Sequence, residues 1–164
     1  MLWRVGEGEC EGNGYVDDCR GWNVVSQNDD IAGTATQHGN GVAGIIGAAG
    51  NNSKGMTGVN CHVKMMLVAG GNTIAGILSA CEYIRTNRKL YNETGGQRGA
   101  FVVAVNTSWG LDSGFPSDAP LWCEMIDWLG AEGILTVAAT ANNPVDIDLA
   151  GDLPATCPSA SPVS

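Results

Sequence analysis

The sequence has few basic residues. Lysine and arginine together number 8, against 17 aspartates and glutamates, which gives a formal net charge of -9. A protein that binds nucleic acid needs a basic patch to replace the counterions of the phosphates. The composition therefore excludes nucleic acid as an expected partner, and the excess of acidic side chains favours a well-hydrated surface.

Long apolar runs and metal-binding pairs are also lacking. No stretch of about 18 apolar residues is present, so no membrane span is expected. The segment Met1-Leu2-Trp3-Arg4 is followed by glycines and acids, so we expect no secretory peptide in this chain. Because there are two histidines and no C-x-x-C pair among the six cysteines, a structural zinc site is not expected.

The cysteines instead suggest two other roles. Cys10 and Cys19 flank a turn, and they are candidates for a disulfide if the protein is exported. Cys61, Cys81 and Cys123 lie in apolar surroundings, which favours buried free thiols.

Glycine and aliphatic residues are abundant. A chain of 164 residues is long enough for one domain with a substantial core. A hydrophobic content of 44% together with 24 glycines is typical of a packed α/β domain with tight turns. We therefore predict one α/β domain.

Three segments have the composition of strands. Residues 62–68 form a short β-like run, and residues 100–105 and 134–139 are continuous apolar runs. Such runs are typical of strands that are buried on both faces, as in parallel sheets. Parallel sheets with right-handed crossovers place their sites beyond the carboxyl ends of the strands.

Two helices are predicted between these strands. The first begins at an Asn72 cap, has apolar residues spaced three and four apart, and reaches about Leu90. The second begins at a Ser117 or Asp118 cap, has Pro120 in its first turn, and stops at the glycines after residue 129.

The segment from His38 to Val59 allows two interpretations. Its glycines at 39, 41 and 44 match the dinucleotide-binding pattern G-x-G-x-x-G. That pattern needs a preceding buried strand and an acidic residue about twenty positions later. Residues 32–37 are too polar for the strand, and no aspartate or glutamate lies between Asp30 and Glu82. The context for nucleotide binding is therefore missing.

The second interpretation depends on a longer motif. The residues are His38-Gly39-x-x-Val42-Ala43-Gly44-Ile45-Ile46-Gly47, followed by Gly50-Asn51-Asn52, Gly55 and Gly58-Val59. This pattern resembles the catalytic-histidine motif of subtilisin-like serine proteases, in which the first histidine is the general base and opens a buried helix. The resemblance implies that role for His38. Asn40 and Gly41 replace the family's threonine and second histidine, which affects the expected packing more than the role.

Two later segments carry the resemblance further. Ser108-Trp109-Gly110 follows the predicted strand at 100–105, where the family has a Ser-x-Gly segment that binds the peptide backbone of the substrate. Asn142 takes the position of the asparagine whose amide stabilises the oxyanion, and its other explanation is ordinary turn chemistry at a strand end. Trp109 is bulkier than the usual aliphatic residue and is expected to narrow an adjacent pocket.

A loop after the histidine motif resembles the family's structural calcium site. The resemblance implies, as ligands, the Asn52 side chain and the backbone carbonyls of Gly50, Lys54 and Met56. Oxygen ligands on a tight loop suit a hard cation. The family's site also uses an upstream aspartate that we cannot assign in this sequence.

The resemblance implies a doubly wound parallel sheet with helices on both faces, truncated at both ends. Residues 1–33 resemble an acidic insert, residues 34–152 form an αβαβαβ core, and residues 153–164 form a proline-rich tail. The segments that would carry the triad aspartate and the nucleophilic serine are not found, so the chain alone is expected to be inactive.

The resemblance implies a secreted endopeptidase with polypeptide substrates, and nucleic acid and membranes are not expected partners. A non-catalytic peptide-binding or structural module is the alternative. Exposed sheet edges are expected to favour self-association.

Overall fold

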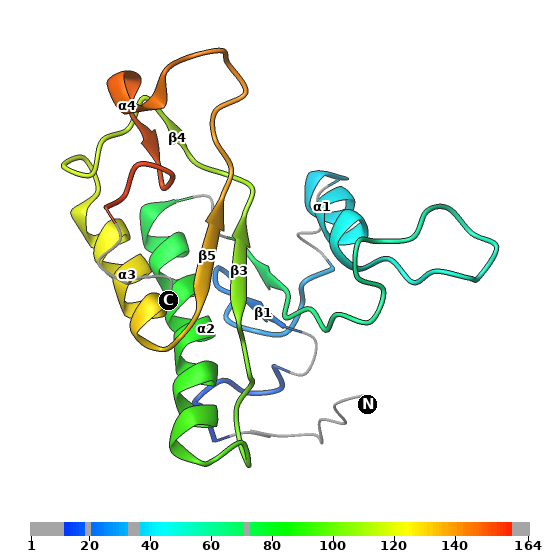
Figure 1. Ribbon diagram of the computed structural model, residues 1–164. Coiled ribbons are helices and arrows are strands. Elements are labelled where there is room, and N and C mark those ends of the chain that lie inside the picture. Colours follow the sequence, from blue (N-terminus) through cyan, green and yellow to red (C-terminus); the bar gives the residue numbers. More distant parts are fainter. Residues whose placement is uncertain (1–11, 19–20, 33–36, 71–72, 159–164) are drawn as a thin grey trace. The chain divides into compact units, whose positions relative to one another are not determined.

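The computed structural model describes residues 12–18, 21–32, 37–70 and 73–158. They belong to two compact units. Within the described residues, unit 1 lies in 15–70, and unit 2 comprises 12–14 together with 73–158. The colours of Figure 1 follow the chain through both.

The predicted alternation of helices and strands is present, so the α/β class is confirmed. No described helix combines the length and apolar character needed to cross a membrane.

Unit 1 contains a short parallel pair of strands and one helix. β1 (Trp22–Asn23) pairs with β2 (Val68–Ala69), and α1 (Gln37–Gly47) lies between them in the sequence. The predicted strand at 62–68 is wrong except at its last residue. β1 offers only two residues for pairing, so residues 62–67 have no partner strand within the described parts of the chain.

The C-terminal end of α1 is closed by the chain that returns after it. The amides of Gly58, Val59 and Asn60 donate to the carbonyls of Ala48, Ile45 and Ile46. These bonds satisfy carbonyl groups that would otherwise lack partners at a helix end. A Cβ on Gly58 would contact the backbone of Gly47 and Ala48, so this return requires glycine.

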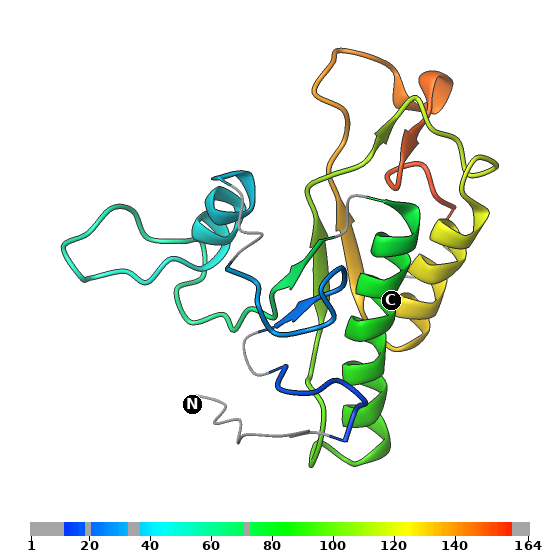
Figure 2. The ribbon, with the colours of Figure 1, turned by 180° about the vertical axis from the view of Figure 1, so that it is seen from behind.

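Unit 2 is built on two parallel strands and two long helices. β3 (Ala104–Thr107) pairs with β5 (Leu135–Ala138), and α2 (Ile74–Glu93) packs against α3 (Pro120–Ala131). Figures 1 and 2 show both helices on the same side of this strand pair. The buried side chains of the two helices are Ile77, Cys81, Tyr83, Ile84, Asn87, Trp122, Cys123, Met125 and Leu129.

The prediction that these strands are buried on both faces is wrong. Side chains alternate along the strands: Val105, Thr107, Thr136 and Ala138 are buried or half-buried on the inner face, toward the helices. Leu135 and Val137 on the outer face are 49% and 48% exposed. The difference arises because α2 and α3 both cover the inner face. Among the described residues each sheet has two strands, so the doubly wound sheet stays a prediction.

Both helices begin close to the predicted positions, with different caps. Asn72 lies outside the described residues, and the hydroxyl of Thr73 caps α2 by accepting a hydrogen bond from the Gly76 amide at 3.1 Å. The prediction that Ser117 or Asp118 caps α3 is wrong. The residue before α3 is Ala119, and the Asp118 carboxylate accepts from the Phe115 amide at 2.8 Å, closing the preceding turn instead.

Three shorter elements complete unit 2. β4 (Leu111–Asp112) follows β3, and β6 (Asp152–Leu153) follows α4 (Ile147–Ala150). β4 and β6 pair in antiparallel fashion, so the chain after β3 is joined to the chain near residue 153.

Asn87 connects three segments of unit 2. Its Nδ2 donates to the Tyr83 carbonyl, and its Oδ1 accepts from the Asn13 side chain at 3.1 Å. Its carbonyl accepts from the Ala100 amide at 3.0 Å. Gly99 has φ +73°, and a Cβ there would overlap the Asn87 carbonyl oxygen. The approach to β3 therefore depends on glycine at this position.

Cys61, Cys81 and Cys123 were predicted to be buried free thiols, and the prediction is wrong for two of them. Cys123 forms a disulfide with Cys157, and Cys61 is exposed. Cys81 is a buried free thiol as predicted, and burial, with a smaller contribution from the charge of Glu82, raises its pKa to about 11. Its thiol is therefore protonated at neutral pH and is a poor nucleophile. Cys10 and Cys19 lie outside the described residues.

The Thr136 hydroxyl is buried and has no hydrogen-bond partner among the described residues. Thr136→Val keeps the branched shape and removes this unpaired polar group, so we expect a gain of about 1 kcal/mol in the free energy of unfolding. Thr107→Val is the matched control, because the Thr107 hydroxyl donates to the Val137 carbonyl at 3.2 Å. Urea unfolding should show opposite signs for the two variants, and a loss of stability in Thr136→Val would contradict the assignment.

Candidate active site

The parallel pairing of β3 and β5 brings two predicted site segments to one end of unit 2. Thr107 and Ala138 are partners at the ends of the strands, and the Ala139 amide continues the ladder by donating to the Thr107 carbonyl at 3.1 Å. Residues 108–110 and 139–142 therefore leave the sheet from the same edge. The carboxyl ends of parallel strands are the usual location of sites in α/β proteins.

Ser108 and Trp109 are held by specific contacts within unit 2. The Ser108 hydroxyl accepts a hydrogen bond from the Asn106 side chain at 2.9 Å. The Trp109 ring stacks on the buried Trp122 ring of α3, with centroids 5.4 Å apart, and remains 39% exposed. One face of the indole is thus fixed on the core. The prediction that this ring narrows an adjacent pocket stays a prediction.

Gly110 has a structural requirement of its own. A Cβ at this position would overlap the Leu153 carbonyl oxygen of β6. The glycine in Ser108-Trp109-Gly110 is therefore needed for the close approach of two backbones, whatever part it takes in binding a ligand.

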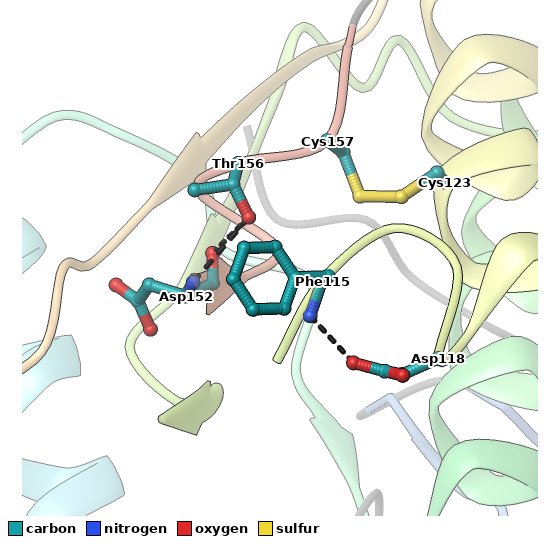
Figure 3. The surroundings of a disulfide bond; sticks show 6 residues. All are labelled: Phe115, Asp118, Cys123, Asp152, Thr156 and Cys157. Carbon is teal, nitrogen blue, oxygen red and sulfur yellow. Dashed lines mark hydrogen bonds between the residues drawn. A yellow bond between two sulfur atoms is a disulfide. The ribbon is translucent and has the colours of Figure 1, made fainter. Parts of the chain in front are cut away.

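Asn142 is exposed after β5, and its side chain makes no hydrogen bond with the described residues. Its amide group is therefore available to donate to a ligand. The preceding residue is held, because the Ala141 amide donates to the Asp152 carboxylate at 2.8 Å. Figure 3 shows Asp152 close to Thr156, and the Cys123–Cys157 disulfide close by.

His38 belongs to unit 1, as do the calcium-loop residues, whereas Ser108, Trp109, Gly110 and Asn142 belong to unit 2. His38 is the second residue of α1, so the helix begins where the sequence predicts it. The side chain of His38 is exposed. The buried helix implied by the resemblance is not observed. No residue of α1 is buried, and Ile45 is 62% exposed.

The predicted calcium loop forms a tight turn. The Asn52 Nδ2 donates to the Ala49 carbonyl at 3.0 Å, and its Oδ1 accepts from the Lys54 amide at 3.0 Å. Gly50, Lys54 and Met56 would contribute backbone carbonyls only. The segment from 50 to 56 has no carboxylate, and no cluster of metal-binding His, Cys, Asp or Glu side chains occurs in the described parts of the chain. All the ligands proposed there are neutral.

Asp152 is the residue that the sequence did not single out. The residue is 2% exposed, and its carboxylate, which projects from β6, accepts a hydrogen bond from the Ala141 amide. The available signal was a charged residue between Gly151 and the apolar Leu153.

Unit 2 is thus an α/β structure whose candidate site lies at the carboxyl ends of two parallel strands. Comparison with known proteins specifies the class. The model of the Subtilase family, Peptidase_S8, matches residues 9–163, and the chain belongs to this family. No solved structure matches the chain significantly.

Two curated relatives are both called subtilisin-like protease 1. The protein from Plasmodium berghei (strain Anka) is 28% identical over 137 residues, covering 80% of this chain and 20% of the relative. The protein from Plasmodium vivax is 42% identical over 57 residues, covering 35% of this chain and 9% of the relative. The chain therefore spans a fifth or less of each relative.

Proposed function

We propose that this chain forms part of the catalytic domain of a subtilisin-like serine endopeptidase that hydrolyses polypeptides. Membership of the subtilase family supports a peptidase function. The observation that carries the proposal is the parallel register of β3 and β5, which places residues 108–110 and Asn142 at the same edge of unit 2. A peptide-binding wall and an oxyanion donor must lie together in such an enzyme.

In the proposed reaction His38 takes the proton from a serine nucleophile and later gives it to the leaving amine. Asn142 donates a hydrogen bond to the oxyanion that develops on the scissile carbonyl. The exposed carboxamide, free of partners among the described residues, supports this role. Ser108, Trp109 and Gly110 would line the peptide. The triad also needs an aspartate and a serine, and the family's segments that carry them are lacking in these 164 residues, so we expect no hydrolysis by them alone.

The test uses the longest natural protein that contains these residues. Fluorogenic peptide cleavage and labelling by a serine-directed phosphonate are measured for the wild type and for three variants. We expect His38→Ala to lower kcat by about 10⁶-fold and Asn142→Ala by about 10²- to 10³-fold. Asn143→Ala, the exposed neighbour, is the control and should retain activity. Unchanged kcat in both of the first two variants would overturn the proposed roles.

The same experiment decides between an enzyme and a binding module. Retained peptide binding without phosphonate labelling or cleavage in the long protein would favour the non-catalytic peptide-binding module. Labelling that is lost on exchange of one serine for alanine would identify the nucleophile. Labelling of that serine in the 164-residue chain itself would contradict the expectation that this chain is inactive alone.

Secretion is proposed together with this function. The Cys123–Cys157 disulfide supports it, because disulfides persist mainly in oxidising compartments. The proposed substrate is a polypeptide, and neither nucleic acid nor a membrane is an expected partner.

We propose that the complete sheet is doubly wound, with further helices over the outer face of β3 and β5. Leu135 and Val137 are exposed on this face, and no further strand among the described residues pairs with β3 or β5. We expect concentration-dependent self-association in sedimentation experiments. Val137→Thr should reduce it, whereas Thr136→Val on the inner face should not. A chain that stays monomeric at all concentrations would contradict this.

We also propose that calcium binds the loop of Gly50, Asn52, Lys54 and Met56, and that it binds weakly. Affinity rises with the number of charged ligands, and this loop offers neutral oxygens only. In a calcium titration monitored by NMR, the chemical shifts of the loop amides should reach half of their total change at about 10⁻⁴ to 10⁻³ M calcium. Asn52→Ala should abolish the shifts and Asn51→Ala should retain them. If the amide chemical shifts of residues 50–56 did not change on addition of calcium, the proposed site would be wrong.

A further inference from the structure

The connection from β5 to β6 carries Asn142, and few contacts hold its first part. Ala139 continues the ladder with Thr107, and α4 begins at Ile147. Between them, residues 140–144 have one hydrogen bond that joins them to another described part of unit 2. It runs from the Ala141 amide to the Asp152 carboxylate, with N and Oδ2 2.8 Å apart. The direction of the chain at Asn142 therefore depends on this bond.

The burial of the Asp152 carboxylate is energetically unfavourable by itself. The residue is almost fully buried, and a buried carboxylate is unfavourable unless it accepts hydrogen bonds. A bond from an amide to a carboxylate is shorter and stronger than one between neutral groups. The bond to Ala141 thus compensates the burial of Asp152 and orders the segment before Asn142.

The backbone of Asp152 is itself fixed. Its carbonyl accepts from the Thr156 amide at 2.8 Å and from the Thr156 hydroxyl at 2.9 Å. Its amide lies 3.4 Å from the same hydroxyl. The residue after Thr156 is Cys157, whose disulfide to Cys123 anchors the segment on α3 (Figure 3). The carboxylate therefore projects from an anchored turn.

Asp152 also adjoins the other predicted site segment. It pairs with Asp112 across the β4–β6 ladder, and a Cβ built on Gly110 would lie 3.7 Å from its Oδ1. One side chain thus lies beside Gly110 and holds the amide of Ala141. It is placed to fix the spacing between the segment 108–110 and the segment that carries Asn142.

We propose that Asp152 is a positioning residue, which holds the Ala141 amide and thereby orients the Asn142 carboxamide toward the space beside Ser108-Trp109-Gly110. The catalytic part of this inference rests on the proposed function. Asp152 acts through Ala141 and Asn142 and does not itself contact the substrate.

The first test needs no catalysis and uses the 164-residue chain. Amide hydrogen exchange is measured by NMR for the wild type, Asp152→Ala and Asp152→Asn. We expect exchange at Ala141 to become at least about tenfold faster in Asp152→Ala, with less change in Asp152→Asn, which keeps an acceptor oxygen. The Ala139 amide is the internal reference, because its bond to Thr107 should be unaffected. Asp112→Asn, at the exposed cross-strand partner, is the control variant.

If Asp152→Ala does not fold, the Asp152→Asn variant decides. Loss of the carboxylate charge should move the Ala141 amide proton upfield while Ala139 stays in place. Exchange and shift at Ala141 that match the wild type in every folded variant would overturn the hydrogen-bonding role.

The second test measures the consequence for the proposed reaction in the long natural protein. We expect Asp152→Ala to lower kcat by up to about 100-fold with little change in KM. Asp152→Asn should recover part of the loss. The double variant Asp152→Ala with Asn142→Ala should be no slower than Asn142→Ala alone, because the two residues act as a unit.

The two tests separate the two ways of failing. An altered Ala141 amide in a protein that cleaves no peptide would retain the contact and reject the proposed function. An altered amide with unchanged kcat in an active enzyme would reject the positioning role, as would additive losses in the double variant.

Discussion

Removal of the Cys123–Cys157 disulfide is expected to lower the free energy of unfolding of unit 2 by roughly 3 to 4 kcal/mol in the chain-entropy account of cross-links. The bond joins residues separated by 34 positions, so it restricts a long segment of the unfolded chain. This segment contains β5, Asn142 and α4. Because native proteins are stable by only about 5 to 15 kcal/mol, the loss is a large part of the total.

The measurement is urea unfolding of the wild type and of the double variant Cys123→Ala with Cys157→Ala. Cys61→Ser is the matched control, because Cys61 is an exposed free thiol and its exchange should leave the midpoint unchanged. Reducing agent should lower the midpoint of the wild type and leave that of the double variant where it is. Equal midpoints for the wild type and the double variant would show that the cross-link does not stabilise the fold.

Gly99→Ala is expected to destabilise unit 2 by roughly 2 to 5 kcal/mol, the sum of a left-handed backbone cost and an overpacking cost. Gly99 has φ +73°, which disfavours any residue with a Cβ. The added carbon would also overlap the Asn87 carbonyl oxygen and approach the Tyr91 amide. Both neighbours are backbone atoms of α2, so neither can move without distorting the helix.

The control for Gly99→Ala separates the two costs. Gly95 has φ +61°, and a Cβ there would have no neighbour within 4 Å. Gly95→Ala should therefore show the backbone cost alone, about 1 to 2 kcal/mol. Thermal and urea unfolding of both variants give the difference due to overlap. If Gly99→Ala lost no more stability than Gly95→Ala, the close approach to α2 would be wrong.

The helices of unit 2 could be predicted because local pattern determines them. Ile77, Cys81 and Ile84 follow the helical spacing, and all three are buried in α2. The strand at 134–139 was also evident, because a glycine turn bounds a continuous apolar run, and β5 occupies Leu135–Ala138. The parallel pairing with β3 then followed from the helix between them.

Features that depend on distant partners could not be predicted in the same way. The run at 62–68 has strand composition, but the length of a strand is set by its partner, and β1 offers two residues. The apolar residues of β3 and β5 suggested burial on two faces, whereas helices cover one. The pairing of Cys123 with Cys157 requires the chain after β6 to return to α3, and cysteine spacing alone does not encode that return.

The candidate site shows the same division. The residues at strand ends, 108–110 and 142, were found because strand position and family resemblance agree. Asp152 was missed because its importance lies in one hydrogen bond to a backbone amide eleven residues earlier. The roles of His38, Asn142 and the wall residues stay predictions until the variants are measured.

The contact between Asn13 and Asn87 has a practical consequence for limited proteolysis. Unit 2 is discontinuous in the sequence, since residues 12–14 belong with the residues that follow 73. A single cut after Gly70 would therefore produce no fragment that contains all of unit 2. The larger piece would lack Asn13, which donates a hydrogen bond to Asn87 in α2. Isolating a complete unit 2 would require residues 12–14 to be supplied on a separate peptide.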